Sequence, residues 1–437
     1  MRLHSIVPLA LCISLSGCKL LKSSADSADA GPTTLTAADA GVTAKASCTV
    51  ESPPEVLEHW VRTDSGVTVT VLADGRTALG YATGEGTPHA LVLDDTGKAT
   101  HVEVLAGHLQ EEKKASPKTV RQVLRVTPLG FSGAKMKVGV DMTDTNPDKT
   151  KYLRCGPADS EPYVAELPNE DNKADDAGQI DDCRTFSNGH RAWVLSSARM
   201  FSEAMENEMP MAWTVDEKPG KETLKDQILD KKRYAVAKFE HVDPLVYQVP
   251  VGVGVPGVGY VFAARHEGAL VVVRRKGDLE KSGDASKFAL GGVITMPALA
   301  QRGKDVALFT GLMGKTELYG TYFEIEGKPS KPEKIELDDP SPPTEGERNS
   351  VAASFSPGGG VYVVFADGKA GAKRARIGRV DTDMKSTMPV FDVVSTPGAV
   401  SEVRVHAVTD TKVIVTYLSQ AESKGFDLTR TVLSCGK

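Results

Sequence analysis

The sequence lacks the short motifs that mark common catalytic and metal sites. Its 437 residues include no G-x-S-x-G nucleophile elbow and no H-E-x-x-H zinc motif, and no two cysteines have C-x-x-C spacing. An excess of positive charge is also missing, because 52 Lys and Arg stand against 58 Asp and Glu. The mildly acidic balance argues against nucleic acid as a partner.

Long apolar runs are absent as well, apart from the start of the chain. Residues 1–17 contain one Arg, an apolar centre and small residues before Cys18, too short for a membrane span and typical of an export signal. Leu15-Ser16-Gly17-Cys18 resembles the lipobox of bacterial lipoproteins. The resemblance implies cleavage before Cys18, acylation of that residue, and attachment to membrane lipid. A plain secretory signal is the alternative.

The residue after the lipobox and the segment that follows it extend this interpretation. Lys19 stands where an Asp would retain many enteric lipoproteins in the inner membrane, so the resemblance favours the outer membrane. From Lys22 to Ser47 the chain consists largely of Ser, Ala, Asp, Thr and Gly, with too little apolar mass to offset its ordering entropy. We therefore predict a lipoprotein signal peptide at 1–17, a lipid-anchored disordered linker at 18–47 and a folded domain at 48–437.

Four cysteines remain once Cys12 leaves with the signal and Cys18 is acylated. An even number in an exported chain predicts two disulfides, for which three connectivities are possible. We favour Cys48–Cys435, because these residues bracket the folded region and a ring-shaped fold must join its ends. Cys155–Cys183 would then staple the loop-rich stretch between them.

The folded region begins with short extended runs separated by turn residues. Val67–Leu72 alternates in the two-residue period of a strand, and Asp74-Gly75 follows as a tight-turn signal. Further runs at Thr77–Ala82, Ala90–Leu93 and Thr100–Leu105 complete four predicted strands. A sheet this small must stack on copies of itself to bury a core.

One apolar strand recurs to the end of the chain, roughly every 55 residues, near the kelch-like repeat length of about 50. The seven markers are Leu79–Tyr81, Val138–Val140, Trp193–Leu195, Tyr260–Phe262, Val306–Leu308, Val361–Val363 and Val413–Val415. They predict an all-β fold, a single β-propeller of seven four-stranded blades. Six or eight blades and two packed sandwiches are the alternatives. The textual signatures of known propeller families are missing, so no specific family is recognised.

Acidic clusters raise the question of calcium. Two groups offer several carboxylates within a short stretch: Asp141, Asp144 and Asp148, and Asp171, Asp175, Asp176 and Asp182. Compared with an EF-hand loop, the second group has Lys173 at a ligand position and lacks the glycine of the sharp turn. Solvated acidic loops are the preferred interpretation, and we predict no metal or cofactor.

Loops between the second and third strands of propeller blades share one face, beside the central channel. The predicted strands place six such loops there, including a helical insert expected at Ala198–Met209. They carry cations and soft apolar side chains: Arg265, His266, Lys315, Lys369, Lys373, Arg374, Met200 and Phe201. Such a face suits an anionic partner. Alternatively, the Met and Phe side chains form the inward stripe of the insert.

These features predict an exported lipoprotein that acts as a non-enzymatic binding or scaffold propeller. Its expected partners are membrane lipid, through acylated Cys18, and an envelope protein or acidic glycan. The alternative is a carbohydrate-active hydrolase or lyase, since propellers host that chemistry, but this rests on analogy of fold alone. A catalytic carboxylate pair is recognised by its spacing in space, which a sequence does not display.

Overall fold

The computed structural model describes residues 47–436. Gaps lie at 62–65, 160–162, 168–178, 188–191, 200–206, 216–233, 236–238, 241–250, 277–281, 343–345, 395–397 and 422–424, with a few single positions besides. Between residues 163 and 240, only the backbone of the strands is described. The predicted signal, Cys18, the linker, Met200, Phe201, Asp171, Asp175 and Asp176 fall outside the described residues.

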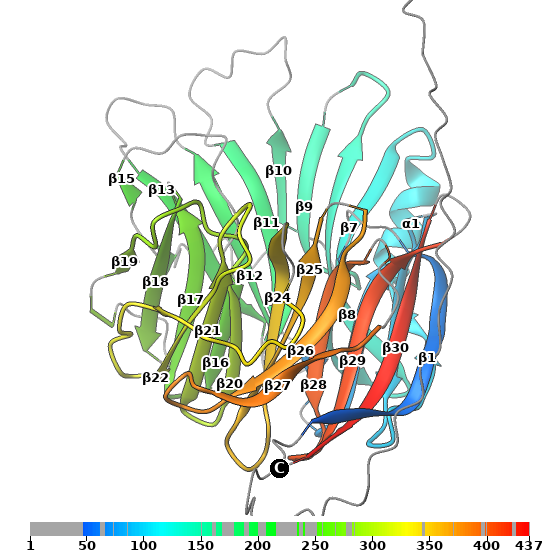
Figure 1. Ribbon diagram of the computed structural model, residues 1–437. Coiled ribbons are helices and arrows are strands. Elements are labelled where there is room, and N and C mark those ends of the chain that lie inside the picture. The colour runs from blue at the N-terminus through cyan, green and yellow to red at the C-terminus, as the bar shows by residue number, and fades with distance from the viewer. Residues whose placement is uncertain are drawn as a thin grey trace, which may run out of the picture. The chain divides into compact units, whose positions relative to one another are not determined.

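The described strands form seven sheets, each built mainly from strands that are consecutive along the chain (Figure 1). The first contains β2 (Thr68–Val71), β3 (Thr77–Ala82), β4 (Pro88–Leu93) and β5 (Ala99–Val102). The second contains β6 (Val104–Leu105), β7 (Val120–Ser132), β8 (Lys135–Thr145), β9 (Lys151–Pro157) and β10 (Tyr163–Leu167). The third contains β11 (Gln179–Ser187), β12 (Ala192–Arg199), β13 (Asn207–Val215), β14 (Tyr234–Ala235) and β15 (Phe239–Glu240).

Four sheets follow in the same manner. The fourth contains β16 (Val251–Val255), β17 (Gly259–His266), β18 (Ala269–Lys276) and β19 (Ser286–Phe288). The fifth contains β20 (Ala298–Arg302), β21 (Asp305–Gly311), β22 (Leu318–Glu324) and β23 (Glu333–Lys334), and the sixth β24 (Glu347–Phe355), β25 (Val361–Gly368), β26 (Arg374–Val380) and β27 (Ser386–Asp392). The last combines β28 (Val400–Ala407), β29 (Lys412–Gln420) and β30 (Phe426–Cys435) with β1 (Cys48–Val61), the first strand of the chain.

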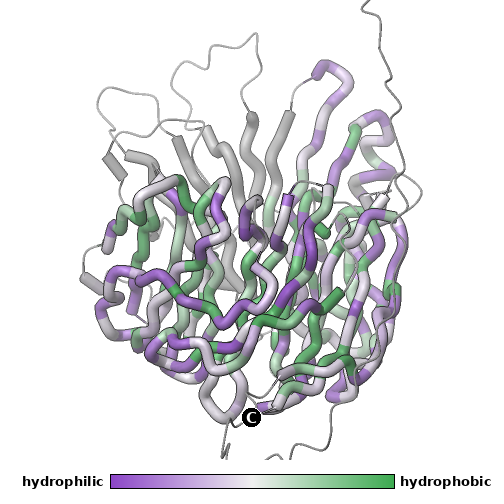
Figure 2. Tube along the Cα trace, in the orientation of Figure 1, coloured by the Kyte–Doolittle hydropathy of each residue, from purple (hydrophilic) through white to green (hydrophobic). Residues whose placement is uncertain are grey.

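Local sequence explains the strand ends in the first sheet. β3 has the predicted bounds, and Gly75 in the turn before it has φ +83°, a conformation that glycine adopts without steric cost. The four strands pair antiparallel in chain order. The tube in Figure 2 shows hydrophobic residues along the strands and hydrophilic residues at many turns, as expected for small sheets with buried faces.

Among the residues whose side chains are described, buried apolar clusters join neighbouring sheets. One cluster packs Leu79 and Leu91 of the first sheet against Ile414 and Val432 of the last. Others join the first and second sheets, the fourth and fifth, the fifth and sixth, and the sixth and last. Each predicted marker run lies in a different sheet. The fold is thus all-β and a single β-propeller; its blade number stays a prediction, because side chains of the third sheet are not described.

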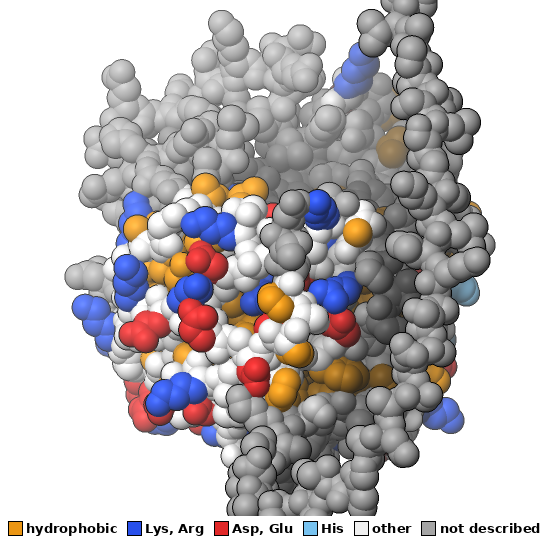
Figure 3. Space-filling view, viewed as in Figure 1, with side chains coloured by type: hydrophobic (Ala, Val, Ile, Leu, Met, Phe, Trp, Pro, Cys, Tyr) orange, Lys and Arg blue, Asp and Glu red, His pale blue; other side chains and the backbone are white. Residues whose placement is uncertain are grey.

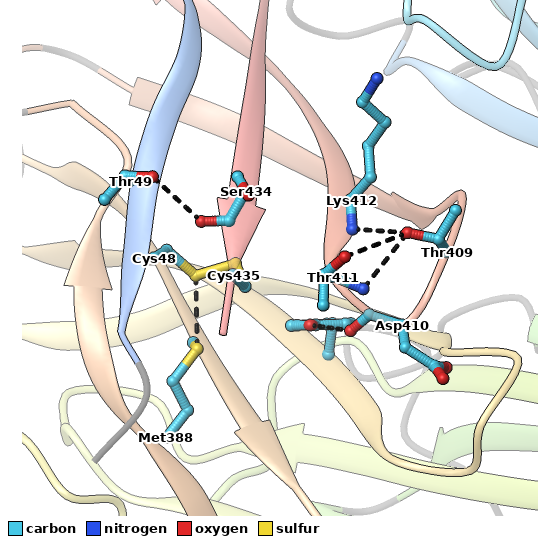
Figure 4. Close-up of a disulfide and its surroundings, with 10 residues drawn as sticks. Cys48, Thr49, Met388, Thr409, Asp410, Thr411, Lys412, Ser434 and Cys435 are labelled. Atoms are coloured by element: carbon cyan, nitrogen blue, oxygen red, sulfur yellow. Dashed lines mark hydrogen bonds between the residues drawn. A yellow bond between two sulfur atoms is a disulfide. The ribbon is translucent and has the colours of Figure 1, made fainter. Parts of the chain in front are cut away.

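A strand from the start of the chain completes the last sheet. β1 pairs antiparallel with β30, and Cys48 lies directly opposite Cys435. These two residues form the predicted disulfide (Figure 4), with Met388 Sδ 3.3 Å from Cys48 Sγ. The disulfide and the strand pairing join the ends of the domain, which confirms the reasoning from ring closure.

Polar contacts tie the last sheet to the first as well. Arg430 on β30 makes an ion pair with Glu55 on β1 and donates to the carbonyl of Gly97, in the turn between β4 and β5. Val67 N donates to Glu402 Oε2 on β28, at 2.9 Å. Closure therefore combines apolar burial, a covalent bond and hydrogen bonds.

Three local expectations need correction or extension. The helical insert predicted for Ala198–Met209 is wrong at both ends, because Ala198 and Arg199 belong to β12, while residues 207–209 belong to β13. Strand pairing therefore overrides helix propensity there. The predicted strand Thr100–Leu105 divides into β5 and β6, and β6 pairs parallel with β8 of the second sheet. The helix α1 (Gly107–Ala115) was not anticipated. Within the described residues, no helix is long and apolar enough to cross a membrane.

Prediction for the closing disulfide. Replacing Cys48 and Cys435 together with Ser should lower the free energy of unfolding by about 2–4 kcal/mol, because the bond restricts the unfolded chain. Urea unfolding of the variant and the parent, both under non-reducing conditions, measures the difference. Equal unfolding curves would show that the bond contributes nothing to closure. Peptide mapping should also recover Cys48 linked to Cys435.

Candidate functional site

A groove lies where the outer strand of the sixth sheet meets the outer strand of the last. It encloses about 670 Å³, within the roughly 300–1,000 Å³ typical of ligand sites. The lining residues are Val50, Pro54, Pro340, Ser341, Val390, Phe391, Asp392, Val393 and Val394. Figure 3 shows hydrophobic side chains gathered on this side of the molecule over β27. The walls are thus largely apolar, and Ser341 and Asp392 supply the polar lining.

All four strands of the sixth sheet, with the segment before it, contribute to a buried charge network behind this polar end. The Arg376 guanidinium is fully buried and contacts three carboxylates. Its Nη2 lies 2.7 Å from Asp339 Oδ1, its Nη1 3.1 Å from Asp367 Oδ2 and its Nε 2.6 Å from Asp392 Oδ1. It also donates to Ser341 Oγ at 3.1 Å. Asp392 and Ser341 therefore belong both to the groove and to the network.

Two further arginines complete the network. Arg348 donates to Asp339 Oδ2 at 2.8 Å and to Asp367 Oδ2 at 3.2 Å. Arg374 donates to Asp392 Oδ2 at 2.9 Å and to the Ser341 carbonyl at 3.3 Å. The three carboxylates are thus matched by three guanidinium groups, so the buried charges compensate one another.

The electrostatics of the network suit a fixed binding surface rather than acid–base catalysis. Burial raises the pKa of Asp339, but the hydrogen bonds and charge of Arg376 outweigh this effect and hold the pKa below its ordinary value. Glycoside cleavage needs one carboxyl group that stays protonated near neutral pH. Asp339, with its lowered pKa, does not provide that group. The enzyme alternative gains no support from this cluster.

The loops predicted to share a face are linked by contacts. Arg265 Nη1 lies 3.6 Å from Met313 Sδ, at the start of the loop between β21 and β22 of the fifth sheet. In the same loop, Gly314 N donates to Glu347 Oε2 at 3.2 Å, while Lys373 Nζ donates to Glu347 Oε1 at 2.9 Å. The structure thereby brings together loops of the fourth, fifth and sixth sheets.

The charge of that face is lower than the sequence suggested. Lys373 is paired with Glu347, and Arg374 with Asp392, which compensates both cations locally. Lys315 is half exposed, and its Nζ lies 3.8 Å from Glu317 Oε2. Lys369 is exposed but also interacts with another group of the protein. The backbone of His266 lies in β17, and its side chain is outside the described set. The face as a binding surface for an anionic partner stays a prediction.

The other predicted site residues have the following places. Asp141 and Asp144 lie in β8, where Arg125 and Arg121 respectively pair with them at 3.4 and 2.8 Å. Among the described residues, no group of three potential ligands could hold a metal ion. Asp148 is exposed and also interacts with another group of the protein. Calcium binding stays an alternative prediction.

The second predicted disulfide is described at one end. Cys155 lies in β9 and is disulfide-bonded. Cys183 lies in β11, and its side chain is outside the described set. Its pairing with Cys155 stays a prediction.

Sequence analysis missed both the groove and the network. Asp339 and Arg376 are 37 residues apart, and the groove combines residues near position 50 with residues near 390. A usable signal was the pair Asp338-Asp339, followed by Pro340, in a connection between predicted blades. A second usable signal was the pair Arg374 and Arg376, two cations that lie two residues apart in the sequence.

Comparisons with known proteins concern the fold. No family model and no curated protein sequence matches the chain. Solved structures similar to it include a protein of unknown function from Dyadobacter fermentans, with a TM-score of 0.48 at 10% identity, covering 89% of this chain and 99% of that one. The intramolecular trans-sialidase from Ruminococcus gnavus has a TM-score of 0.40 at 9% identity, and the match covers 84% of this chain and 95% of that one. The six-bladed propeller lectin from Aleuria aurantia has a TM-score of 0.34 at 11% identity, and the match covers 87% of this chain and 97% of that one. We draw no functional conclusion from TM-scores in this range.

Prediction for the charge network. Replacing Arg376 with Met should lower the free energy of unfolding by about 3–5 kcal/mol, because buried carboxylates lose their counter-charge. Lys304→Met is the control, since Lys304 pairs with Glu326 on the surface and both side chains are 56% exposed. That change should leave the free energy of unfolding nearly unaltered. Urea unfolding measures both, and equal effects would contradict the role given to the network.

Proposed function

We propose that this protein is a lipid-anchored binding propeller of the cell envelope, without catalytic activity of its own. In this proposal the groove between β27 and β1 receives an extended segment of an envelope protein. The observation that carries it is the groove itself, with apolar walls and a polar end whose charges are already paired. Such a surface favours recognition of apolar side chains and offers no group that is ready to transfer a proton.

The position of the groove supports an extended partner segment. β27 and β1 are the outermost strands of their sheets. Exposed edge strands are common docking places for extended peptides, which gain main-chain contacts along the strand and side-chain contacts in adjacent pockets. Pro53 and Pro54 interrupt β1 and remove two backbone donors. We therefore expect side-chain burial in the groove to contribute more to the affinity than a continuous ladder of main-chain hydrogen bonds.

The predicted anchor is compatible with this role. If Cys18 is acylated, about 30 residues separate the lipid from β1, and a flexible chain of that length has an end-to-end distance of roughly 30 Å. The propeller would then reach partners near the membrane surface, and Lys19 favours the outer membrane. We also propose that the ring closes with seven blades, which the seven described sheets support.

Prediction for the anchor. Replacing Cys18 with Ala should abolish metabolic labelling by palmitate and release the protein from the membrane fraction. Fractionation and labelling of the variant beside the parent provide the measurement. Unchanged labelling and unchanged fractionation would contradict the lipoprotein proposal.

Prediction for the groove. Changing Val50 and Val394 to Lys places two charges on the apolar walls and should reduce photo-crosslinking to the partner segment at least about tenfold, or ~1.4 kcal/mol. The crosslinker is placed at Pro54, an exposed residue of the groove lining. Val120→Lys is the control, because Val120 is 69% exposed on β7 of the second sheet. It should leave crosslinking unchanged.

The outcome that contradicts the groove is equally specific. Crosslinking that survives Val50→Lys with Val394→Lys, in a variant with an unchanged melting temperature, would show that the apolar walls do not bind the partner. Crosslinking lost equally in Val120→Lys would point to a general effect of surface charge.

A further inference from the structure

An exposed tryptophan lies near the end of β1, at the opposite end of that strand from the groove. The Trp60 side chain is 60% exposed, although indole is among the side chains that gain most from burial. Its φ is +63°, in the left-handed region that bulky residues rarely adopt. Trp60 thus departs both from the usual burial of tryptophan and from the usual backbone conformation of a bulky residue.

The backbone around Trp60 is a β-bulge. Glu58 lies opposite Leu428 and Val61 opposite Phe426, so β1 has one residue more than β30 between these pairs. Gly84 N donates to the Trp60 carbonyl at 2.7 Å and fixes the bulge against the first sheet. Bulges redirect side chains and are frequent beside binding and active sites. Here the bulge accompanies an indole that faces solvent.

Strain at such a position calls for a function. A glycine would adopt the same φ without steric cost, and an asparagine would adopt it at a lower cost than tryptophan. Residues held in unfavourable backbone conformations cluster where a ligand uses them. The fold buries little of the indole. The stabilisation that tryptophan gains from burial must therefore come from a ligand that covers the ring.

Polar groups close to Trp60 in the chain, and on the facing part of β30, are already hydrogen-bonded. Glu58 Oε2 accepts from Tyr81 OH at 3.0 Å, and Glu58 Oε1 accepts from the backbone N of His59 at 3.1 Å. The His59 ring lies 3.0 Å from Asp427 Oδ1 through Nδ1, and its side chain is 66% exposed. Burial lowers the pKa of His89, which stacks on Tyr81. Burial therefore favours the neutral form of that ring.

We propose that Trp60 is a stacking platform for a pyranose ring of a neutral glycan. The C–H face of such a ring covers an aromatic plane, and its hydroxyl groups exchange hydrogen bonds with the neighbouring imidazole and carboxylate groups. Glu58 and Asp427 disfavour anionic ligands by like-charge repulsion. Hydrogen bonds already fix both carboxylates in direction, which suits directed bonds to sugar hydroxyl groups more than the less directional attraction of a cation. The inference rests on the proposed binding function and adds a ligand class at a second site.

The test uses the mature, detergent-solubilised lipoprotein. Neutral hexose oligosaccharides, sulfated oligosaccharides and tetramethylammonium are titrated separately, with tryptophan fluorescence and calorimetry as readouts. Neutral oligosaccharides should bind and shift the fluorescence, whereas the other two probes should not. Binding of tetramethylammonium without the neutral sugars would overturn the proposal in favour of a cation site, and binding of sulfated sugars alone would also overturn it.

Variants separate binding from folding. Trp60→Gly should weaken binding of neutral oligosaccharide at least tenfold and leave the melting temperature unchanged or raised, because glycine relieves the backbone strain. Trp60→Asn should give the same result if glycine loosens the strand. Trp60→Phe should keep part of the affinity. Undiminished binding in Trp60→Gly would overturn the proposal.

The two sites fail independently. Trp60→Gly should still crosslink the partner segment in the groove, and the double change of Val50 and Val394 to Lys should still bind oligosaccharide. Loss of oligosaccharide binding in the groove variant, with the melting temperature unchanged, would show that the sugar occupies the groove rather than the indole.

Discussion

The pairing of β1 with β30 is the constraint on which the rest of the structure depends. Each small sheet buries its faces only against neighbours, so the ring is stable only if its last sheet is complete and packs on the first. β1 supplies the missing strand, Cys48–Cys435 fixes its start, and Arg430 holds its middle through Glu55. Since these contacts join residues from the two ends of the domain, closure is a property of the whole chain.

The same strand carries the features that we associate with binding. Of the seven large hydrophobic side chains that are exposed among the described residues, three lie on β1: Val50, Val56 and Trp60. Val50 contributes to the groove and Trp60 to the bulge. The outer strand of a closed blade is thus rigid on its inner edge and available on its outer edge. This combination suits recognition, because a partner meets a surface that is already ordered.

Sequence reasoning succeeded where the determinants are local. The Asp74-Gly75 turn and the alternation of the first unit located β3, and the even number of cysteines, with the need for closure, gave Cys48–Cys435. It failed where tertiary pairing decides. Helix-forming composition at Ala198–Met209 gave way to strand pairing at both ends. The partners of Arg376 come from distant positions, and the exposure of Trp60 follows from a bulge that has no periodic signature.

Native-state hydrogen exchange of the oxidised protein measures directly whether β1 is part of the closed ring. We predict that the β1 amides paired with β30 exchange only with global unfolding, at the same free energy as the amides of β29. If the β1 amides instead exchange through a local opening while β29 stays protected, β1 is a detachable edge. Closure would then not depend on β1, and the two proposed binding sites would lack the fixed strand on which they are built.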